Sequence, residues 1–298
     1  MTAMKILECI PNISEGKDRD KIDAVAAVIS SAEGVKLLDV CRDPDHHRTV
    51  FTFIGPPGEL EKVALAALGR ALKLIDMREH RGVHPRIGAV DVVPFVPLAG
   101  SDMEDAVEAA HSFGRRFAET YRIPVYFYGE AALRPERREL PSVRRGGYES
   151  LEARLKDPHW RPDAGPAELD PRSGAAAVGA RVPLIAFNVN LRSGDVEAAK
   201  RIARAVRHSS GGLSHVRAIG VLLKSRGIAQ VSMNLTDYRV TPVSKAFAAV
   251  KEEALKLGIE ILESELVGLI PEAALEGVRA EDVLLSNFRE ECIIERHL

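Results

Sequence analysis

Two histidines and three arginines crowd residues 75–89, and side chains of these types suit acid–base chemistry on an anionic substrate. They are His80, His84, Arg78, Arg81 and Arg86. Pro85 has no backbone donor and biases His84 toward an extended backbone. An imidazole fixed on a stiff bend among cationic groups is suited to proton transfer. The alternative is an ordinary solvated loop that carries surface charges.

The flanking patterns predict the elements that would hold these side chains. An amphipathic pattern over residues 59–77 predicts a helix that ends near His80. The apolar run over residues 90–96 predicts a buried strand. Gly82 allows a sharp change of direction between them. His84 is therefore expected on a rigid bend that leads into a buried strand.

The remaining periodicities predict one order of elements twice, strand–helix–strand–strand–helix–strand, which is the ferredoxin-like unit. In the first half, the expected strands are 5–10, 35–41, 49–54 and 90–96, and the helices are 19–31 and 59–77. In the second half, the expected strands are 183–191, 216–223, 228–235 and 259–267, and the helices are 195–207 and 241–257, with Thr241 as N-cap. The chain is therefore expected to be an α+β protein with two ferredoxin-like subdomains, residues 1–180 and 181–298.

Two further elements and a long irregular segment are expected between these halves. Ser101 and Glu104 predict a capping box for a helix that reaches Tyr121, and a strand follows at 124–129. Residues 131–179 are rich in Pro, Gly and Arg, with a short helical pattern near 148–155, and we expect them to be weakly structured. Five arginines cluster there: Arg134, Arg137, Arg138, Arg144 and Arg145. They form either a solvated face or a site for a ligand with several carboxylates.

Composition excludes several classes of protein. The 298 residues are 46% hydrophobic and 28% charged, which is ordinary for a globular protein. The net charge of −2 argues against a general nucleic-acid binder. Three cysteines without a CxxC pair favour a reducing compartment, and no apolar run approaches the ~18 residues of a membrane span, so a cytoplasmic location is expected. No phosphate-binding loop or dinucleotide fingerprint occurs.

A metal site is the alternative interpretation of the histidines. His80 and His84, together with the turn at residues 45–47, have the residue types of a metal-dependent hydrolase. That interpretation requires both histidines on one helix face, which Gly82 and Pro85 oppose. We therefore expect no bound metal, and the simpler interpretation of residues 45–47 is a polar turn between two strands.

Six blocks, in order, resemble the glutamate formimidoyltransferase family. They are ECIPNISEG, RTVFTFIG, LIDMREHRGVHPRIGAVDVVPFVP, PVYFYGEAA, GARVPLIAFNVNL and AQVSMNLTDY, and the resemblance runs from about residue 6 to residue 271. It implies two ferredoxin-like subdomains with a folate tunnel between them. It also implies transfer of a formimino group between N-formimino-L-glutamate and N5 of tetrahydrofolate, in histidine breakdown and one-carbon metabolism. Because the chain ends at Leu298, it resembles the stand-alone form without a cyclodeaminase domain.

The resemblance also implies roles for individual residues. The HPR triplet places the general acid/base on His84. The folate-contacting stretch falls on Gly165, Pro166, Ala167, Glu168, Leu169, Asp170, Pro171, Arg172, Ser173 and Gly174. The candidates for binding a substrate carboxylate or for orienting the substrate are Arg86, Arg48 and Asn12. The sequence departs from the family at His47, where asparagine is usual, and at Cys41, where an acidic or small residue is usual.

The implied mechanism needs one histidine with a pKa near neutrality. N5 of the folate attacks the amidine carbon, and the histidine takes one proton and returns one to the leaving nitrogen. The arginine cluster would hold the anionic tail of a polyglutamylated folate. The alternatives are formyl transfer or cycling of 5-formyltetrahydrofolate, a non-catalytic folate-binding module, and the metal-dependent hydrolase. The partners expected are small molecules, with no nucleic acid and no membrane, and a homodimer is left open.

Overall fold

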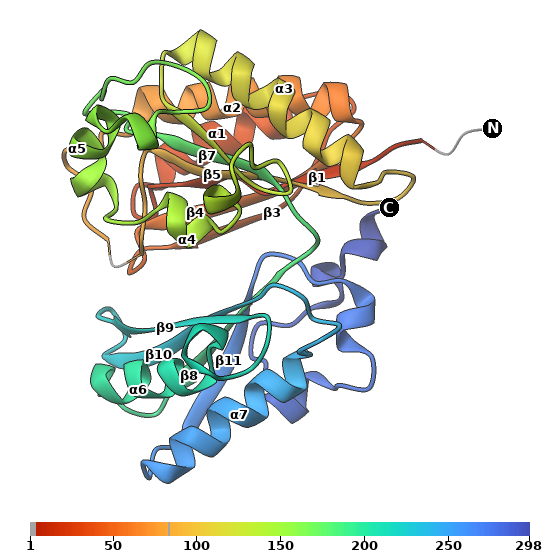
Figure 1. Cartoon of the computed structure of the whole chain (residues 1–298). Coiled ribbons are helices and arrows are strands. Elements are labelled where there is room, and N and C mark those ends of the chain that lie inside the picture. The colour runs from red at the N-terminus through yellow and green to blue at the C-terminus, as the bar shows by residue number, and fades with distance from the viewer. Residues whose placement is uncertain (1–3, 83) are drawn as a thin grey trace. The chain divides into compact units, whose positions relative to one another are not determined.

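The computed structural model describes residues 4–82 and 84–298, and it divides the chain into two compact units. The units are Met1–Arg181 and Val182–Leu298, and each contains one β-sheet with helices (Figure 1). The expected mixed α+β class is therefore confirmed. Within the described residues, no helix has the length and apolar character needed to cross a membrane.

The first sheet has seven strands. They are β1 (Leu7–Cys9), β2 (Asn12–Ile13), β3 (Lys36–Asp43), β4 (Arg48–Gly55), β5 (Val90–Pro97), β6 (Val125–Gly129) and β7 (Ala176–Ala180). β4 pairs with β3 on one side and with β1 and β2 on the other, and β5 pairs with β1 and β2, all antiparallel. β7 then extends the sheet parallel to β5, and β6 lies parallel to β7. The expected strand 5–10 is thus present as β1, and a separate short strand, β2, follows it.

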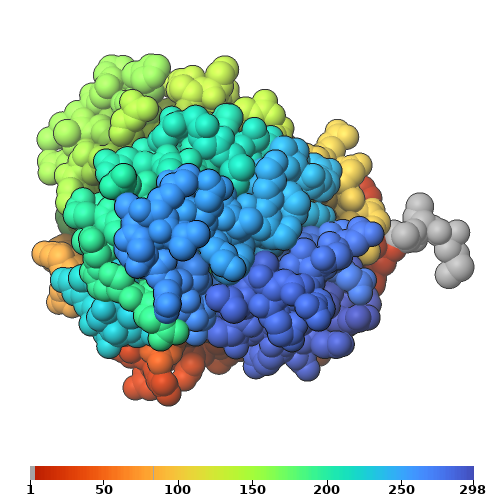
Figure 2. Space-filling view, turned by 90° about the horizontal axis from the view of Figure 1, so that it is seen from below, coloured from red at the N-terminus to blue at the C-terminus, as the bar shows by residue number. Residues whose placement is uncertain are grey.

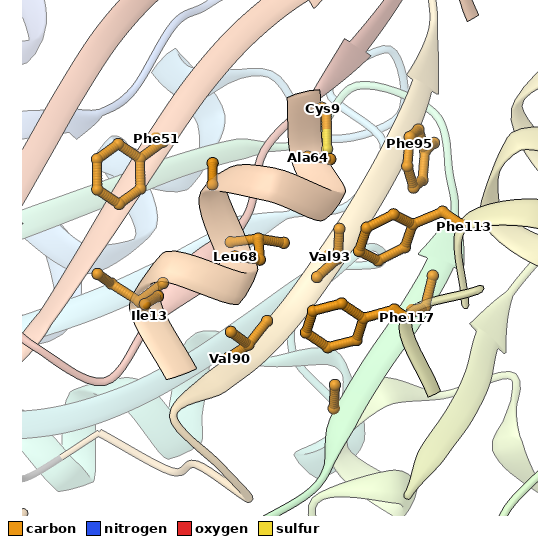
Figure 3. Packing of buried hydrophobic residues seen from close by; sticks show 14 of the residues in the cluster. Cys9, Ile13, Phe51, Ala64, Leu68, Val90, Val93, Phe95, Phe113 and Phe117 are labelled. Carbon is orange, nitrogen blue, oxygen red and sulfur yellow. The ribbon is translucent and has the colours of Figure 1, made fainter. Parts of the chain in front are cut away.

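Three helices cover one face of this sheet: α1 (Arg19–Ser30), α2 (Pro57–Leu74) and α3 (Met103–Tyr121). α2 carries Ala64 and Leu68 toward the strands, and α3 carries Phe113 and Phe117 (Figure 3). These side chains meet alternate residues of β5, such as Val93, because side chains at every second strand position share a face. The buried cluster fixes β5 rigidly at the end of the histidine-bearing loop.

The opposite face of β5, β6 and β7 is covered by the segment that we expected to be weakly structured. It contains α4 (Leu140–Val143), α5 (Leu151–Lys156) and several 3₁₀ turns, and it ends in β7. Val143, Leu151 and Leu155 pack against Val92 and Tyr126 of the sheet. The expectation was wrong because compositional bias hid a second hydrophobic core, although the short helix near 148–155 is confirmed.

The second unit has a four-stranded antiparallel sheet with strand order β11-β8-β10-β9. Its strands are β8 (Ile185–Leu191), β9 (Val216–Leu223), β10 (Ile228–Leu235) and β11 (Ile261–Val267), and its helices are α6 (Val196–Val206) and α7 (Val243–Lys256). Both helices pack on one face around a single buried cluster. The C-terminal segment after β11 forms short 3₁₀ turns that join this cluster through Val283 and Leu285, and its blue surface adjoins that of α7 (Figure 2).

Several helix ends differ from the expectations. α2 ends at Leu74 rather than near His80, because Ile75 is extended and the carboxylate of Asp76 accepts the backbone N–H of Arg78. The capping box of α3 is formed by Asp102 and Asp105 and not by Ser101 and Glu104.

α7 also begins differently. Pro242 occupies its N-cap position, and no side chain caps the helix there. The hydroxyl of Thr241 instead donates to the carbonyl oxygen of Ser214, at 2.6 Å.

Candidate active site

The histidine-bearing loop, residues 75–89, is joined by backbone hydrogen bonds to the end of the expected folate-binding stretch. The N–H of Met77 donates to the carbonyl of Arg172 at 2.9 Å, and the N–H of Ala89 donates to that of Ser173 at 2.8 Å. Gly174 has φ +71°, and a Cβ there would lie 2.4 Å from the carbonyl oxygen of Ile87. Glycine is therefore required where the two segments meet.

The rest of the stretch is less tightly held. Leu169 packs against the cluster between β5 and the segment that contains α4 and α5, and the hydroxyl of Tyr148 donates to the carbonyl of Pro171 at 2.6 Å. Ala167 and Glu168 are exposed. Gly165 has φ +83°, and a Cβ there would lie 2.2 Å from the carbonyl oxygen of Ile123. The structure thus fixes both ends of the stretch and leaves exposed backbone and side chains between them.

His84 has a defined tautomer. Its Nδ1 lies 2.8 Å from the carbonyl oxygen of Pro85, which can only accept, so Nδ1 carries the proton. Its Nε2 lies 2.7 Å from Nη1 of Arg48 and accepts from that guanidinium. Burial, followed by the cations Arg48 and Arg144, holds the pKa of His84 well below 6.5. This corrects the expectation of a pKa near neutrality: the imidazole is neutral, with a lone pair on Nε2.

Arg48 is a partly buried cation at the start of β4. Burial, and then the charge of Arg144, lowers its pKa to about 10, so it stays protonated at neutral pH. Among the residues described, its hydrogen-bond partner is His84, and no carboxylate lies within ion-pair distance. A charge that has lost part of its hydration and has no counter-ion is unfavourable. Arg48 is therefore the part of the site best suited to receive an anionic group.

Arg86 and Asn12, the other two candidates, are already engaged. The guanidinium of Arg86 holds both carboxylate oxygens of Glu149, at 2.7 and 3.1 Å, and its Nε donates to Nδ1 of His80 at 3.0 Å. Asn12 lies on β2, where its amide donates to the carbonyl of Ile10 at 2.9 Å. Both arrangements suit residues that orient the site.

Sequence reasoning missed a buried acid beside the loop. Asp91 is 1% exposed, accepts the N–H of Ile87 at 2.9 Å and pairs with Arg144. The pair ties the strand after the loop to the end of α4. A signal was present, because a charged residue inside the apolar run VDVVPFV requires a buried partner.

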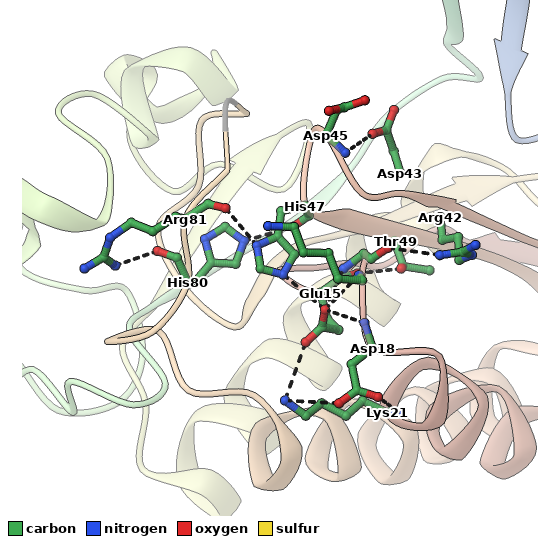
Figure 4. A network of polar contacts seen from close by, with 12 residues as sticks. Glu15, Asp18, Lys21, Arg42, Asp43, Asp45, His47, Thr49, His80 and Arg81 are labelled. Carbon is green, nitrogen blue, oxygen red and sulfur yellow. Dashed lines mark hydrogen bonds and ion pairs between the residues drawn. The ribbon is translucent and has the colours of Figure 1, made fainter. Parts of the chain in front are cut away.

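A second missed acid lies on the opposite side of the loop. The buried carboxylate of Glu15 contacts Nε2 of His47 at 3.1 Å, and the ring of His47 stacks on that of His80 with centroids 4.3 Å apart (Figure 4). The residues are far apart in the sequence, and only the pairing of β2 with β4 brings them together. The turn at residues 45–47 is therefore more than a polar connection.

The structure gives the metal interpretation little support. His80 and His84 both lie outside the helices. Within residues 4–82 and 84–298, no three His, Cys, Asp or Glu side chains are grouped as metal ligands.

Two arginines of the cluster at residues 134–145 form ion pairs within the first unit. Arg137 pairs with Asp163, and Arg144 pairs with Asp91. Of the five clustered arginines, Arg137 is buried, Arg134 and Arg144 are half-buried, and Arg138 and Arg145 are exposed.

Comparisons with known proteins show the family to which the chain belongs. Residues 6–181 match the N-terminal subdomain of the formiminotransferase domain, and residues 186–289 match the formiminotransferase domain. The chain is 44% identical over 297 residues to the glutamate formimidoyltransferase of Thermoplasma acidophilum, covering 99% of this chain and 98% of that protein. It is 40% identical to that of Streptococcus pyogenes serotype M1, covering 99% of each. It is 45% identical to the formimidoyltransferase-cyclodeaminase of Rattus norvegicus over 91% of this chain and 51% of that protein. The chain therefore belongs to the formiminotransferase domain family.

Proposed function

We propose that the protein is a glutamate formimidoyltransferase, which moves a formimino group between N-formimino-L-glutamate and N5 of tetrahydrofolate. Relatives named for this activity support the proposal over nearly the whole chain. The observation that carries it is the neutral imidazole of His84, held against the unpaired cation Arg48. A base and an anion-binding group side by side are what transfer from a glutamate derivative requires.

His84 supplies the proton transfers. N5 attacks the amidine carbon, and the N5 proton passes to Nε2 of His84. The imidazolium so formed is a strong acid because its pKa is depressed, and it protonates the glutamate nitrogen as the carbon–nitrogen bond breaks. The two transfers leave His84 neutral, as it began, and a well-placed general acid/base is worth about 10²–10⁴-fold in rate.

Arg48 binds a carboxylate of the glutamate derivative. In the structure it donates to Nε2 of His84, the nitrogen that must take the proton. A carboxylate that accepts from the guanidinium replaces that contact with a charge-assisted one and frees Nε2. Binding of the donor thereby prepares the base, which ties proton transfer to the presence of substrate.

Tetrahydrofolate binds as co-substrate along Gly165–Gly174. The backbone bonds that join this stretch to Met77 and Ala89 support its placement beside the loop of His84. Exposed residues in its middle offer backbone and side-chain contacts. Holding both reactants in a reactive geometry contributes more than the proton transfers themselves.

We also propose that both units are ferredoxin-like subdomains, divided as residues 1–180 and 181–298. In the second sheet the strands lie in the order fourth, first, third, second, counted along the unit. The same order runs through β5, β1 with β2, β4 and β3 of the first unit. β6 and β7 are then an addition at the edge of the first subdomain.

A direct assay tests the proposed function. The purified protein is mixed with tetrahydrofolate and either N-formimino- or N-formyl-L-glutamate, and the glutamate released and the folate product are measured. We expect turnover with the formimino donor that exceeds turnover with the formyl donor. A preference for the formyl donor would assign formyl transfer instead. Folate binding without turnover of either donor would reduce the protein to a binding module.

A further inference from the structure

His47 presents both of its ring nitrogens to groups that only accept hydrogen bonds. Nδ1 lies 2.9 Å from the carbonyl oxygen of Arg81, and Nε2 lies 3.1 Å from Oε1 of Glu15. A neutral imidazole has one N–H, so it can satisfy only one of these acceptors. An imidazolium satisfies both. The geometry therefore favours the doubly protonated ring.

Glu15 is held as an anion opposite this ring. Its Oε1 accepts the backbone N–H groups of Gly16, Lys17 and Asp18 at 3.0, 2.9 and 3.1 Å. Burial alone would raise the pKa of Glu15, but the donors from His47 and the backbone lower it to about 2. The carboxylate is thus charged at every pH at which the protein would be assayed.

His80, stacked on His47, is held neutral by its own contacts. Its Nε2 lies 2.9 Å from the carbonyl oxygen of His47 and must donate, which leaves Nδ1 to accept from Nε of Arg86 at 3.0 Å. Burial lowers the pKa of His80 to about 4, with contributions from the charges of His47 and Arg86. The stacked pair therefore carries one positive charge, on His47.

We propose that His47 is a positioning residue that acts as an imidazolium, bridging Glu15 to the backbone of Arg81 and so fixing the loop that carries His84. The inference rests on the proposed function only in taking His84 as the base. His47 does not reach the reacting atoms. It acts on the backbone three residues before His84 and, through its own carbonyl, on the ring of His80 (Figure 4).

The packing around Gly82 shows that the loop and the turn fit closely. A Cβ at Gly82 would lie 2.6 Å from the carbonyl oxygen of His46 and 2.9 Å from Cβ of His47. A small displacement of the turn is therefore transmitted to the loop two residues before His84.

Charged and titratable groups surround His47 on three sides. They are Glu15, Asp18 and Lys21 on one side, Asp43, Asp45 and His46 in its own turn, and His80 and Arg86 in the loop.

Nitrogen NMR of the histidine rings tests the protonation state without substrate. We expect protein labelled with ¹⁵N-histidine, at pH 7.5, to show His47 with two protonated nitrogens and His80 with a proton on Nε2 alone. His47→Asn and His80→Gln assign the signals. In Glu15→Gln the acceptor oxygen remains but its charge is lost, so we expect the doubly protonated fraction of His47 to fall. A singly protonated His47 in the wild-type protein would overturn the proposal.

Kinetics of His47→Asn test the positioning role. His47 has φ +51°, which asparagine also adopts readily, and the amide keeps one donor but no charge. We expect kcat to fall about tenfold or more, because small misplacements of a base are costly, while the KM for tetrahydrofolate changes little. We expect the pH profile of kcat to differ between the wild-type protein and the variant, because asparagine cannot carry the charge of an imidazolium. His208→Asn, an exposed histidine of the second unit, is the matched control. Wild-type kcat with an unchanged pH profile in His47→Asn would refute the role, whatever the donor preference proves to be.

Discussion

Nε2 of His84 lies 2.7 Å from Nη1 of Arg48, so the base of the proposed reaction shares a hydrogen bond with a partly buried cation. The contact has two consequences. The cation opposes protonation of the imidazole, which keeps the base ready at neutral pH. It also occupies the nitrogen that must react, so an incoming carboxylate has to draw the guanidinium away.

Replacing Arg48 with glutamine should move the pH profile as well as weaken substrate binding. The pKa of His84 is depressed first by burial and then by Arg48, so removing the cation raises that pKa toward 6.5. Because the base must be unprotonated, the acidic limb of kcat/KM should shift to higher pH. KM for N-formimino-L-glutamate should rise about tenfold or more with the loss of a charge-assisted contact. Arg19→Gln, at the exposed start of α1, should leave both unchanged. An acidic limb that stays in place would remove Arg48 from control of the base.

Replacing His84 with alanine should lower turnover by at least about a hundredfold, because both proton transfers are lost. Tetrahydrofolate binding, measured by calorimetry, should remain close to wild type, since the backbone bonds of the stretch 165–174 do not use the imidazole. His159→Ala makes the same substitution at an exposed histidine of the first unit. Near wild-type turnover in His84→Ala would exclude this residue as the base.

Chelators should leave turnover unchanged, and no stoichiometric zinc should copurify. The expectation rests on the contacts of the histidines: the ring nitrogens of His47 and His80 are occupied by protein groups, and Nε2 of His84 faces a cation. A guanidinium at 2.7 Å is incompatible with a metal ion on the same nitrogen. One tightly held equivalent of metal that turnover requires would favour the hydrolase interpretation.

Local patterns were sufficient where one segment determines its own conformation. Helical and alternating periodicities located most of the helices and strands, and Pro85 placed His84 on a bend outside any helix. The patterns were insufficient where the partner lies far away in the sequence. The strand Ala176–Ala180 is short and made mostly of alanine, and it is stabilised by pairing with β5 and β6.

The same distinction separates the predicted site residues from the missed ones. His84 and Arg86 occur in one contiguous block that could be read directly. Glu15 meets His47 across 32 positions, and Arg144 meets Asp91 across 53. Neither pair can be inferred from spacing, because sheet pairing and the covering segment bring them together. The arginine cluster shows the same limit, because its composition does not say which of its members are buried.

The free energy of unfolding of the first unit should decrease as pH is lowered, and part of this decrease should depend on His80. The folded-state pKa of His80, about 4, lies below its ordinary value of 6.5 because the ring is buried. Between these values the unfolded chain binds a proton that the folded chain does not, so stability is complete above pH 6.5 and is lost as pH falls toward 4. The linkage amounts to roughly 3 kcal/mol. His80→Gln should flatten this part of the curve in urea unfolding at a series of pH values. A variant that keeps the wild-type slope would contradict the assignment.

Arg137 and Arg138, adjacent in the sequence, should differ sharply when each is replaced by methionine. The side chain of Arg137 is 0% exposed, pairs with Asp163 at 2.5 Å and donates to the carbonyl of Arg161 at 2.6 Å. Its loss leaves a buried carboxylate without its counter-ion, which costs about 3–5 kcal/mol. Arg138 is 62% exposed and pairs with Glu130 at the surface, so its loss should cost at most about 1 kcal/mol.

Trp160, the single tryptophan of the chain, reports on this comparison from within the first unit. Its fluorescence in a urea titration should show a midpoint that is clearly lowered in Arg137→Met and nearly unchanged in Arg138→Met. The residual charge can be tested by adding Asp163→Asn to Arg137→Met: the amide oxygen still accepts the N–H of Phe127, which the carboxylate binds at 2.8 Å. Because the double variant no longer buries an unpaired anion, it should recover part of the lost stability. Equal midpoints for the two single variants would mean that the buried pair contributes no more than a surface one, and that the segment covering the sheet is held by its apolar contacts alone.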